Sequence, residues 1–189
     1  MSRAFVFILL LFAATLALVF WPDGKVEQTT DNQALRADQP DGIAEDLQVR
    51  QFNEKGQLSM QVNAQSMAHY GLRQETWLTE PKFELYDQDK RSPWRITADK
   101  AKVTAQRLVD LQNNVIIQSL IKDAPITRVD TDNLELDLDS KTMNTDAPVV
   151  IVGPGYTTKG VGLDAMLDGQ QVRLKSQVST EYEQLKDHQ

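Results

Sequence analysis

The sequence predicts an all-β domain that follows a single membrane-spanning helix. Three observations support this prediction: one long uncharged segment near the N-terminus, apolar residues at every second position over much of the remaining chain, and an internal repeat of about 33 residues. Together they divide the chain into a short tail (1–3), an anchor (4–21), a linker (22–40) and a β-domain (41–189).

The segment from Ala4 to Trp21 carries no charge over 18 residues. At 1.5 Å per residue, this length just crosses a hydrocarbon core of about 30 Å. A removed signal peptide is the alternative, with a possible cleavage site at 15–17, but the apolar run continues past that site to Trp21. Arg3 precedes the run and Asp23 follows it, so the positive-inside rule leaves the tail in the cytoplasm and the domain outside.

The polar segment 22–40 is bracketed by Pro22 and Pro40 and is predicted to be a linker. Beyond it, apolar and polar residues alternate. Successive side chains of a strand point to opposite faces, so alternation predicts strands with one buried face and one wet face. Turn-forming residues separate these runs at 53–56, 87–90 and 168–169. The runs are LSMQVNA (58–64), PKFELYD (81–87), LELDLDS (134–140), GVGLDAML (160–167) and QVRLKSQVSTEYE (171–183).

The repeat decides how one ambiguous segment is interpreted. TADKAKV (97–103) resembles DTDNLEL (130–136), and the apolar segments NNVIIQ (113–118) and APVVIV (147–152) are separated by a similar interval. Because a repeat adopts the same structure in each copy, 97–103 is predicted to be a strand, although Ala98, Ala101 and Val103 break strict alternation. A stack of such units predicts a β-jelly-roll or half-barrel.

Catalytic and metal-binding patterns are weak. The net charge of −7 argues against nucleic acid, and the absence of cysteine excludes disulfides and thiolate chemistry. GPGYTTKG (153–160) lacks the residues of a phosphate loop after its last glycine, and the aspartates of 130–146 do not fit a calcium loop. No nucleophile with a base and an orienting group is evident. We therefore predict a protein that is not an enzyme, with no metal and no cofactor.

Several segments together carry a family resemblance: FNEKGQLSMQVNAQSMAHY (52–70), WRITADKAKVT (94–104), LQNNVII (111–117) and the long stretch 131–163. In their order and spacing the chain resembles the LptC family, the membrane-anchored component of the lipopolysaccharide export machinery of Gram-negative bacteria. The resemblance implies an open, twisted, antiparallel β-jelly-roll with LptA/OstA-like repeats, held in the periplasm by an inner-membrane anchor. It also implies that the domain receives lipopolysaccharide from the LptBFG transporter and passes it to LptA.

The apolar face then has two interpretations. From the residues alone a packed core is favoured, whereas the resemblance favours a groove that shields acyl chains, since burying each methylene gains about 0.8 kcal/mol. Such retention should depend only weakly on salt. The residues expected to line the groove are Leu47, Val49, Leu58, Met60, Leu78, Phe83, Leu85, Ile96, Val103, Val115, Ile117, Leu134, Leu136, Val149, Ile151, Leu163, Leu174, Val178 and Tyr182.

An open β-roll leaves unpaired backbone groups at both ends, where a partner strand can add. The strand near Leu47 and Val49 is expected to meet the transporter, and the strand that carries Val172, Leu174, Val178 and Tyr182 is expected to meet LptA. The same edges could pair two copies of an isolated domain. Two rival functions remain open at this stage: a membrane-tethered scaffold that binds envelope proteins without lipid, and a periplasmic hydrolase, which the missing acid–base groups disfavour.

Overall fold

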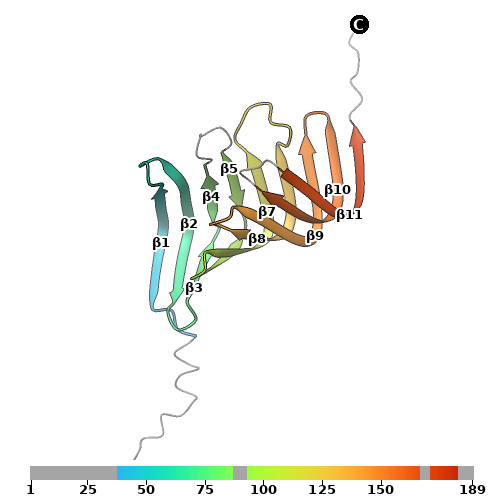
Figure 1. Cartoon of the computed structure of the whole chain (residues 1–189). Coiled ribbons are helices and arrows are strands. Elements are labelled where there is room, and N and C mark those ends of the chain that lie inside the picture. Colours follow the sequence, from blue (N-terminus) through green and yellow to red (C-terminus); the bar gives the residue numbers. More distant parts are fainter. Residues whose placement is uncertain (1–37, 87–92, 167–170, 183–189) are drawn as a thin grey trace, which may run out of the picture. The chain divides into compact units, whose positions relative to one another are not determined.

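The computed structural model describes residues 38–86, 93–166 and 171–182 (Figure 1). The predicted anchor, the linker up to residue 37, and the predicted turns at 87–90 and 168–169 lie outside these ranges. Within them, none of the secondary structure is a helix of the length and apolar character needed to cross a membrane.

The described residues form eleven strands in one antiparallel sheet, which confirms the all-β prediction. Along the sheet, β11, β10, β9, β8 and β7 follow one another, and β7 then pairs with both β5 and β6. The strands are β1 (Gly42–Phe52), β2 (Leu58–Tyr70), β3 (Glu75–Thr79), β4 (Lys82–Leu85), β5 (Trp94–Thr97), β6 (Lys100–Thr104), β7 (Leu108–Ser119), β8 (Arg128–Asp137), β9 (Thr142–Gly153), β10 (Tyr156–Met166) and β11 (Gln171–Tyr182).

The short strands are the two halves of bent strands. β3 and β4 both pair with β2, and β5 and β6 both pair with β7. Glu80 and Pro81 separate the first two, and Glu80 has a φ of 48°. Ala98 and Asp99 separate the second two. Each pair is therefore one strand that turns a corner at its middle.

The long strands bend at equivalent positions. Asp46 in β1, Asn113 in β7 and Gln177 in β11 have positive φ angles of 51°, 61° and 52°, and Gly162 in β10 has one of 75°. Register shifts occur at the same level in the pairings of β7 with β8 and of β9 with β10. Corners at Asp46, Glu80 and Asn113 recur about every 33 residues, so one repeat is one pair of bent strands.

The corners fold the sheet into two half-sheets around one core. Half-sheet A contains β4, β5, the first half of β2 and the second half of β7; half-sheet B contains β3, β6, the second half of β2 and the first half of β7. Buried side chains from both halves belong to a single apolar cluster, including Phe83 and Ile96 from half-sheet A and Leu78 and Leu111 from half-sheet B. Facing half-sheets are the usual way for an antiparallel sheet to bury one face.

The corner at Asp99 explains the broken alternation noted in the sequence. Ala98 and Ala101 are both buried because the chain changes direction between them. The strand prediction for 97–103 is confirmed, except that 98–99 link two strands. The alternating runs do not give the strand ends: β8 ends at Asp137, so Leu138 lies in the following turn, and β10 begins at Tyr156, before the run at 160–167.

Turns predicted from the sequence are present where the structure describes them. Asn53 Oδ1 accepts hydrogen bonds from the backbone N–H groups of Lys55 and Gln57, and Gly56 has a φ of 73°. Pro154 and Gly155 form the tight turn between β9 and β10, with Gly155 at a φ of 76°. Within GPGYTTKG, the residues Pro154 and Gly155 therefore make a strand-to-strand turn, and the positive φ at Gly155 favours glycine there.

Both ends of the sheet are open in the described part of the chain. β1 pairs only with β2, and β11 pairs only with β10 (Figure 1). The unpaired sides of these two strands carry the backbone groups that the sequence predicted to be docking edges.

Candidate functional site

A cavity of about 320 Å³, here called the apolar cavity, opens between the two half-sheets. Its walls come from strand residues and from the connection between β7 and β8. Its volume lies at the lower end of the range of about 300–1,000 Å³ typical of small-molecule sites. Its lining consists of Trp94, Ile117, Ser119, Ile121, Asp123, Ala124, Pro125, Ile126, Val129, Met143, Leu163, Ala165, Met166 and Val172.

Cross-strand pairing places these residues. Ile117 of β7 pairs with Val129 of β8 on half-sheet A, and Met143 of β9 pairs with Ala165 of β10 on half-sheet B. Residues paired directly across neighbouring strands share a face, so each pair adds a continuous strip of apolar wall.

The connection between β7 and β8 covers one side of the apolar cavity. Ala124 of this connection is buried, and the hydroxyl of Tyr156 donates a hydrogen bond of 2.7 Å to the carbonyl oxygen of Pro125. Gly153 lies beneath it: a Cβ there would stand 2.2 Å from the Tyr156 ring and 2.5 Å from the Pro125 oxygen. The Tyr156 ring, packed on Gly153, and its hydrogen bond to Pro125 therefore hold the connection between β7 and β8 over the cavity.

A second cavity, of about 280 Å³, lies between the strand ends nearer to β1. Its apolar residues are Leu58, Met60, Leu85 and Leu138. The Arg107 side chain lies across its rim and donates hydrogen bonds to Asp139 Oδ1 at 2.6 Å and to Gln51 Oε1 at 3.2 Å. Space between the half-sheets is therefore present near both ends of the sheet.

Most residues that the sequence predicted to line a groove lie in the packed core. Ile117 and Leu163 line the apolar cavity, and Leu58, Met60 and Leu85 line the second cavity. The buried members of the predicted set are Met60, Leu78, Phe83, Leu85, Ile96, Val115, Ile117, Leu134, Leu136, Val149, Ile151 and Leu163. Leu47, Leu58, Val103 and Leu174 are half-buried, and Val49, Val178 and Tyr182 are exposed.

The exposed members of the set face inward at the two open ends. Val49 pairs with the buried Val62, yet it is 43% exposed because no further strand covers β1. At the other end, Tyr182 pairs with Tyr156 and is 78% exposed. Val172, which was predicted only as a docking-edge residue, pairs with the buried Ala165 and is also exposed. The apolar interior is thus uncovered at both edge strands.

Sequence reasoning missed several lining residues, notably Trp94, Val129, Met143 and Ala165. Val129 and Met143 are each followed two residues later by a buried threonine, Thr131 or Thr145. These hydroxyls are satisfied internally: Thr131 donates to the Pro148 carbonyl and Thr145 to Asn133 Oδ1. If threonine is counted as an inward residue, the alternation extends through Val129 and Thr131 in β8 and through Met143 and Thr145 in β9.

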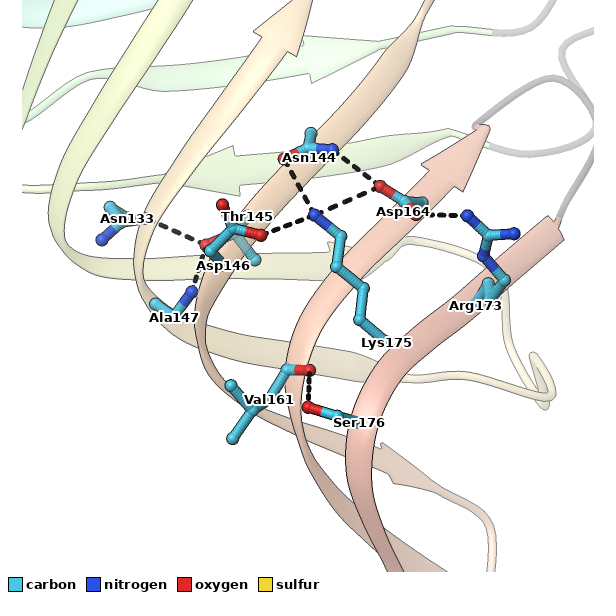
Figure 2. Close-up of polar contacts among 10 residues, drawn as sticks. All are labelled: Asn133, Asn144, Thr145, Asp146, Ala147, Val161, Asp164, Arg173, Lys175 and Ser176. Carbon is cyan, nitrogen blue, oxygen red and sulfur yellow. Dashed lines mark hydrogen bonds and ion pairs between the residues drawn. The ribbon is translucent and has the colours of Figure 1, made fainter.

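Polar contacts fasten the outward face of β11 to its neighbours (Figure 2). Lys175 Nζ lies 2.7 Å from Asp146 Oδ1 on β9 and 3.5 Å from Asp164 Oδ1 on β10, and Arg173 Nη2 lies 2.7 Å from Asp164 Oδ2. The Lys175 stem crosses β10 at Gly162, where a Cβ would stand 2.6 Å from Lys175 Cδ. The hydrogen bond to Asp146 raises the pKa of Lys175, and the one from Arg173 lowers the pKa of Asp164.

A carboxylate on β4 is held by two donors near the second cavity. Tyr86 Oη donates to Glu84 Oε2 at 2.9 Å, and Arg95 Nη2 donates to Glu84 Oε1 at 2.9 Å. Burial alone would raise the pKa of Glu84, but the hydrogen bonds and charge of these partners outweigh it and lower this pKa. Burial and the bond to Glu84 raise the pKa of Tyr86.

Replacing Glu84 with glutamine should make the folded domain less sensitive to acid. Because the folded-state pKa of Glu84 lies below 4.5, its ionised form contributes stability above that value, and this is lost as pH falls through the folded pKa. The free energy of unfolding of Glu84→Gln should lie below that of the native chain at neutral pH, and the gap should narrow in acid. Urea unfolding at several pH values measures this gap, with the exposed Glu135→Gln as the control for the charge change; a gap that does not change with pH would contradict the assignment.

Throughout the three described ranges, no three histidine or acidic side chains gather closely enough to hold a metal ion. The chemistry that the described site offers is apolar shelter between half-sheets that are open at their edges.

Comparisons with known proteins point in one direction. The family model described as "Lipopolysaccharide-assembly, LptC-related" matches residues 6–183. The chain is 25% identical over 183 residues to the lipopolysaccharide export system protein LptC of Escherichia coli strain K12. This alignment covers 97% of the chain and 96% of the Escherichia coli protein. It is 24% identical over 176 residues to the protein of the same name from Haemophilus influenzae, with 83% of this chain and 84% of that protein covered.

Proposed function

Because the chain belongs to the LptC family, we propose that it works in lipopolysaccharide export as a passive carrier anchored in the inner membrane. It receives lipopolysaccharide from the LptBFG transporter, shields the acyl chains between its half-sheets and passes the molecule to LptA for delivery to the outer membrane. Its domain lies in the periplasm, held by the uncharged segment 4–21.

One observation carries the proposal: the apolar interior contains open space and is uncovered at both edge strands. The apolar cavity offers about 320 Å³ among side chains such as Ile117, Leu163 and Ala165. An acyl chain that enters it leaves water at a gain of about 0.8 kcal/mol for each methylene. This shelter needs no covalent chemistry, so the energy for directional transport comes from a partner.

The edge strands support the proposed transfer between partners. β1 and β11 each have one side without a neighbouring strand, and their inward residues Val49, Val178 and Tyr182 are exposed. A partner strand added there would pair the backbone groups and extend the apolar interior into the next protein. We propose that β1 meets the transporter and β11 meets LptA.

Photo-crosslinking tests the carrier function directly. A photoreactive residue at Leu163, which lines the apolar cavity, should capture lipopolysaccharide in cells. The same residue at Arg173, on the outward face of β11, is the matched control and should not. Equal capture at both positions, or capture at Arg173 alone, would contradict the carrier function.

A scaffold without a lipid ligand is the second candidate function. It is favoured by the tight packing of Phe83, Ile96 and Leu136, each no more than 1% exposed. Mass spectrometry of the full chain extracted from membranes separates the two functions. A carrier should retain glycolipid through a high-salt wash, because apolar retention depends weakly on salt, whereas a scaffold should hold none.

A further inference from the structure

The second cavity differs from the apolar cavity in the side chains that stand at its entrance. The exposed residues that line the apolar cavity include Ile121, Met166 and Val172, which are all apolar. At the second cavity two polar side chains meet instead, and Arg107 Nη2 donates a hydrogen bond of 3.2 Å to Gln51 Oε1. An acyl chain that approaches from solvent therefore meets different chemistry at the two cavities.

The strand register places the two partners of this hydrogen bond on opposite half-sheets. Gln51 pairs with the buried Met60 in the first half of β2, so it faces inward at the end of half-sheet A. Arg107 lies in the turn between β6 and β7, two residues before the buried Val109, at the end of half-sheet B. The hydrogen bond, here called the Arg107–Gln51 bridge, thus joins the half-sheets across the rim of the second cavity.

The backbone of Arg107 is fixed on both sides, so the bridge opens by rotation of a side chain. The Arg107 N–H donates to the Thr104 carbonyl at 3.0 Å, and the Arg107 carbonyl accepts from the Leu138 N–H at 3.2 Å. Asp139 Oδ1 lies 2.6 Å from Arg107 Nε, and the two side chains of this ion pair are 67% and 40% exposed. Exposed pairs of this kind are weak, so the guanidinium can leave the bridge without a change in the sheet.

We propose that the Arg107–Gln51 bridge controls the rate at which acyl chains enter and leave the second cavity. This inference rests on the proposed function, because it assumes that acyl chains occupy the space between the half-sheets. The bridge crosses the gap through which a chain reaches the apolar lining, which includes Met60 and Leu85. A chain passes when the guanidinium turns away, and the bridge forms again behind it. Entry and release are then slowed alike, and the affinity changes little.

Two substitutions at Gln51 should change these rates in opposite directions. Gln51→Leu removes the acceptor at nearly equal size and should raise the rates of entry and release about threefold. Gln51→Glu turns the hydrogen bond into an ion pair with Arg107 and should lower both rates about threefold. The affinity should stay nearly constant in both variants. A general loosening of β1 would not produce opposite changes at one position.

The rates are measured at each cavity separately. A photoreactive aliphatic residue at Leu85, in the wall of the second cavity, captures a saturated fatty acid added to the full chain in nanodiscs. Light flashes at successive times after mixing give the rate of entry, and dilution into lipid vesicles before the flash gives the rate of release. The same photoreactive residue at Leu163 reports on the apolar cavity, where neither substitution at Gln51 should change the rates.

Gln48 is the matched control on the same strand. It pairs with Asn63 and is exposed, and its position three residues from Gln51 places it on the opposite, outward face of β1. Gln48→Leu and Gln48→Glu make the same changes in size and charge as the two substitutions at Gln51. Neither should change the rates measured at Leu85.

Arg107→Lys tests the other side of the bridge. An ammonium lacks the planar fork with which the guanidinium contacts Asp139 and Gln51 together, so this variant should act like Gln51→Leu. Adding Gln51→Leu to Arg107→Lys should then have no further effect on the rates, because the two residues act through one contact.

The outcomes separate this inference from the function on which it rests. Opposite changes at Leu85, with unchanged rates at Leu163, support the role of the bridge. If Gln51→Leu leaves the rates at Leu85 unchanged, or changes them equally at Leu163, the role of the bridge is wrong while the carrier function stands. No capture at Leu85 in the native chain overturns the bridge alone if Leu163 still captures lipid, and overturns both proposals if Leu163 captures none.

Discussion

Replacing Ala165 with phenylalanine is expected to weaken acyl-chain binding by more than about tenfold. Ala165 is 8% exposed and lines the apolar cavity between Met143 and Val172, its partners on either side. The added ring would occupy space that the chain needs, and displacing two or three methylenes costs about 0.8 kcal/mol for each. The binding constant for a fluorescent fatty acid and the crosslinking yield at Leu163 measure the effect.

The control for this substitution is Ala68→Phe. Ala68 is half-buried and pairs with Ile43 and Trp77 on the outward face of β2, so the same gain in volume lies away from the apolar cavity there. Overpacking a filled core costs about 1–3 kcal/mol, and existing space around Ala165 should keep the cost lower. Thermal unfolding checks this point. Undiminished binding in a folded Ala165→Phe protein would mean that the acyl chain lies elsewhere.

Proline substitutions in β11 are expected to separate partner docking from folding. Successive N–H groups of a strand point to opposite sides, so of Ser179 and Thr180 one N–H faces β10 and the other faces the free edge. Proline removes the donor and adds a ring that blocks pairing. One variant should therefore lower the midpoint of thermal unfolding, and the other should leave it nearly unchanged while reducing capture of LptA severalfold.

Position 178 is a poorer site for this test. Gln177 has a φ of 52°, and a residue that precedes proline is restricted to extended conformations, so Val178→Pro would also disturb the corner. Ser179 and Thr180 pair regularly with Lys159 and Thr158. A pulldown with LptA and hydrogen exchange of β10 provide the two readouts. If both variants capture LptA as well as the native chain does, β11 is not the docking edge.

Local patterns predicted the strands because each strand buries only one face. The alternation of Met60, Val62 and Ala64 and that of Phe83 and Leu85 correspond to buried positions in β2 and β4. The repeat correctly identified 97–103 as strand where alternation failed. These features depend on neighbours within a few residues, so a single sequence contains them.

The corners and the cavity depend on contacts that are distant in sequence. Asp46, Glu80 and Gln177 have positive φ angles without being glycine, so their residue types give little indication of a bend. The apolar cavity depends on where the connection between β7 and β8 lies, and on Val129 and Met143, whose alternation continues through threonine. The sequence therefore predicts which residues face inward better than it predicts which of these inward residues line the apolar cavity.

The recurring corner has a consequence for the evolution and engineering of such domains. Each pair of bent strands contributes to both half-sheets, so it forms one complete slice of the interior. Inserting or deleting a slice would lengthen or shorten the conduit while preserving its cross-section and both terminal strands. The distance that a cargo travels could thus be tuned independently of the surfaces that exchange it.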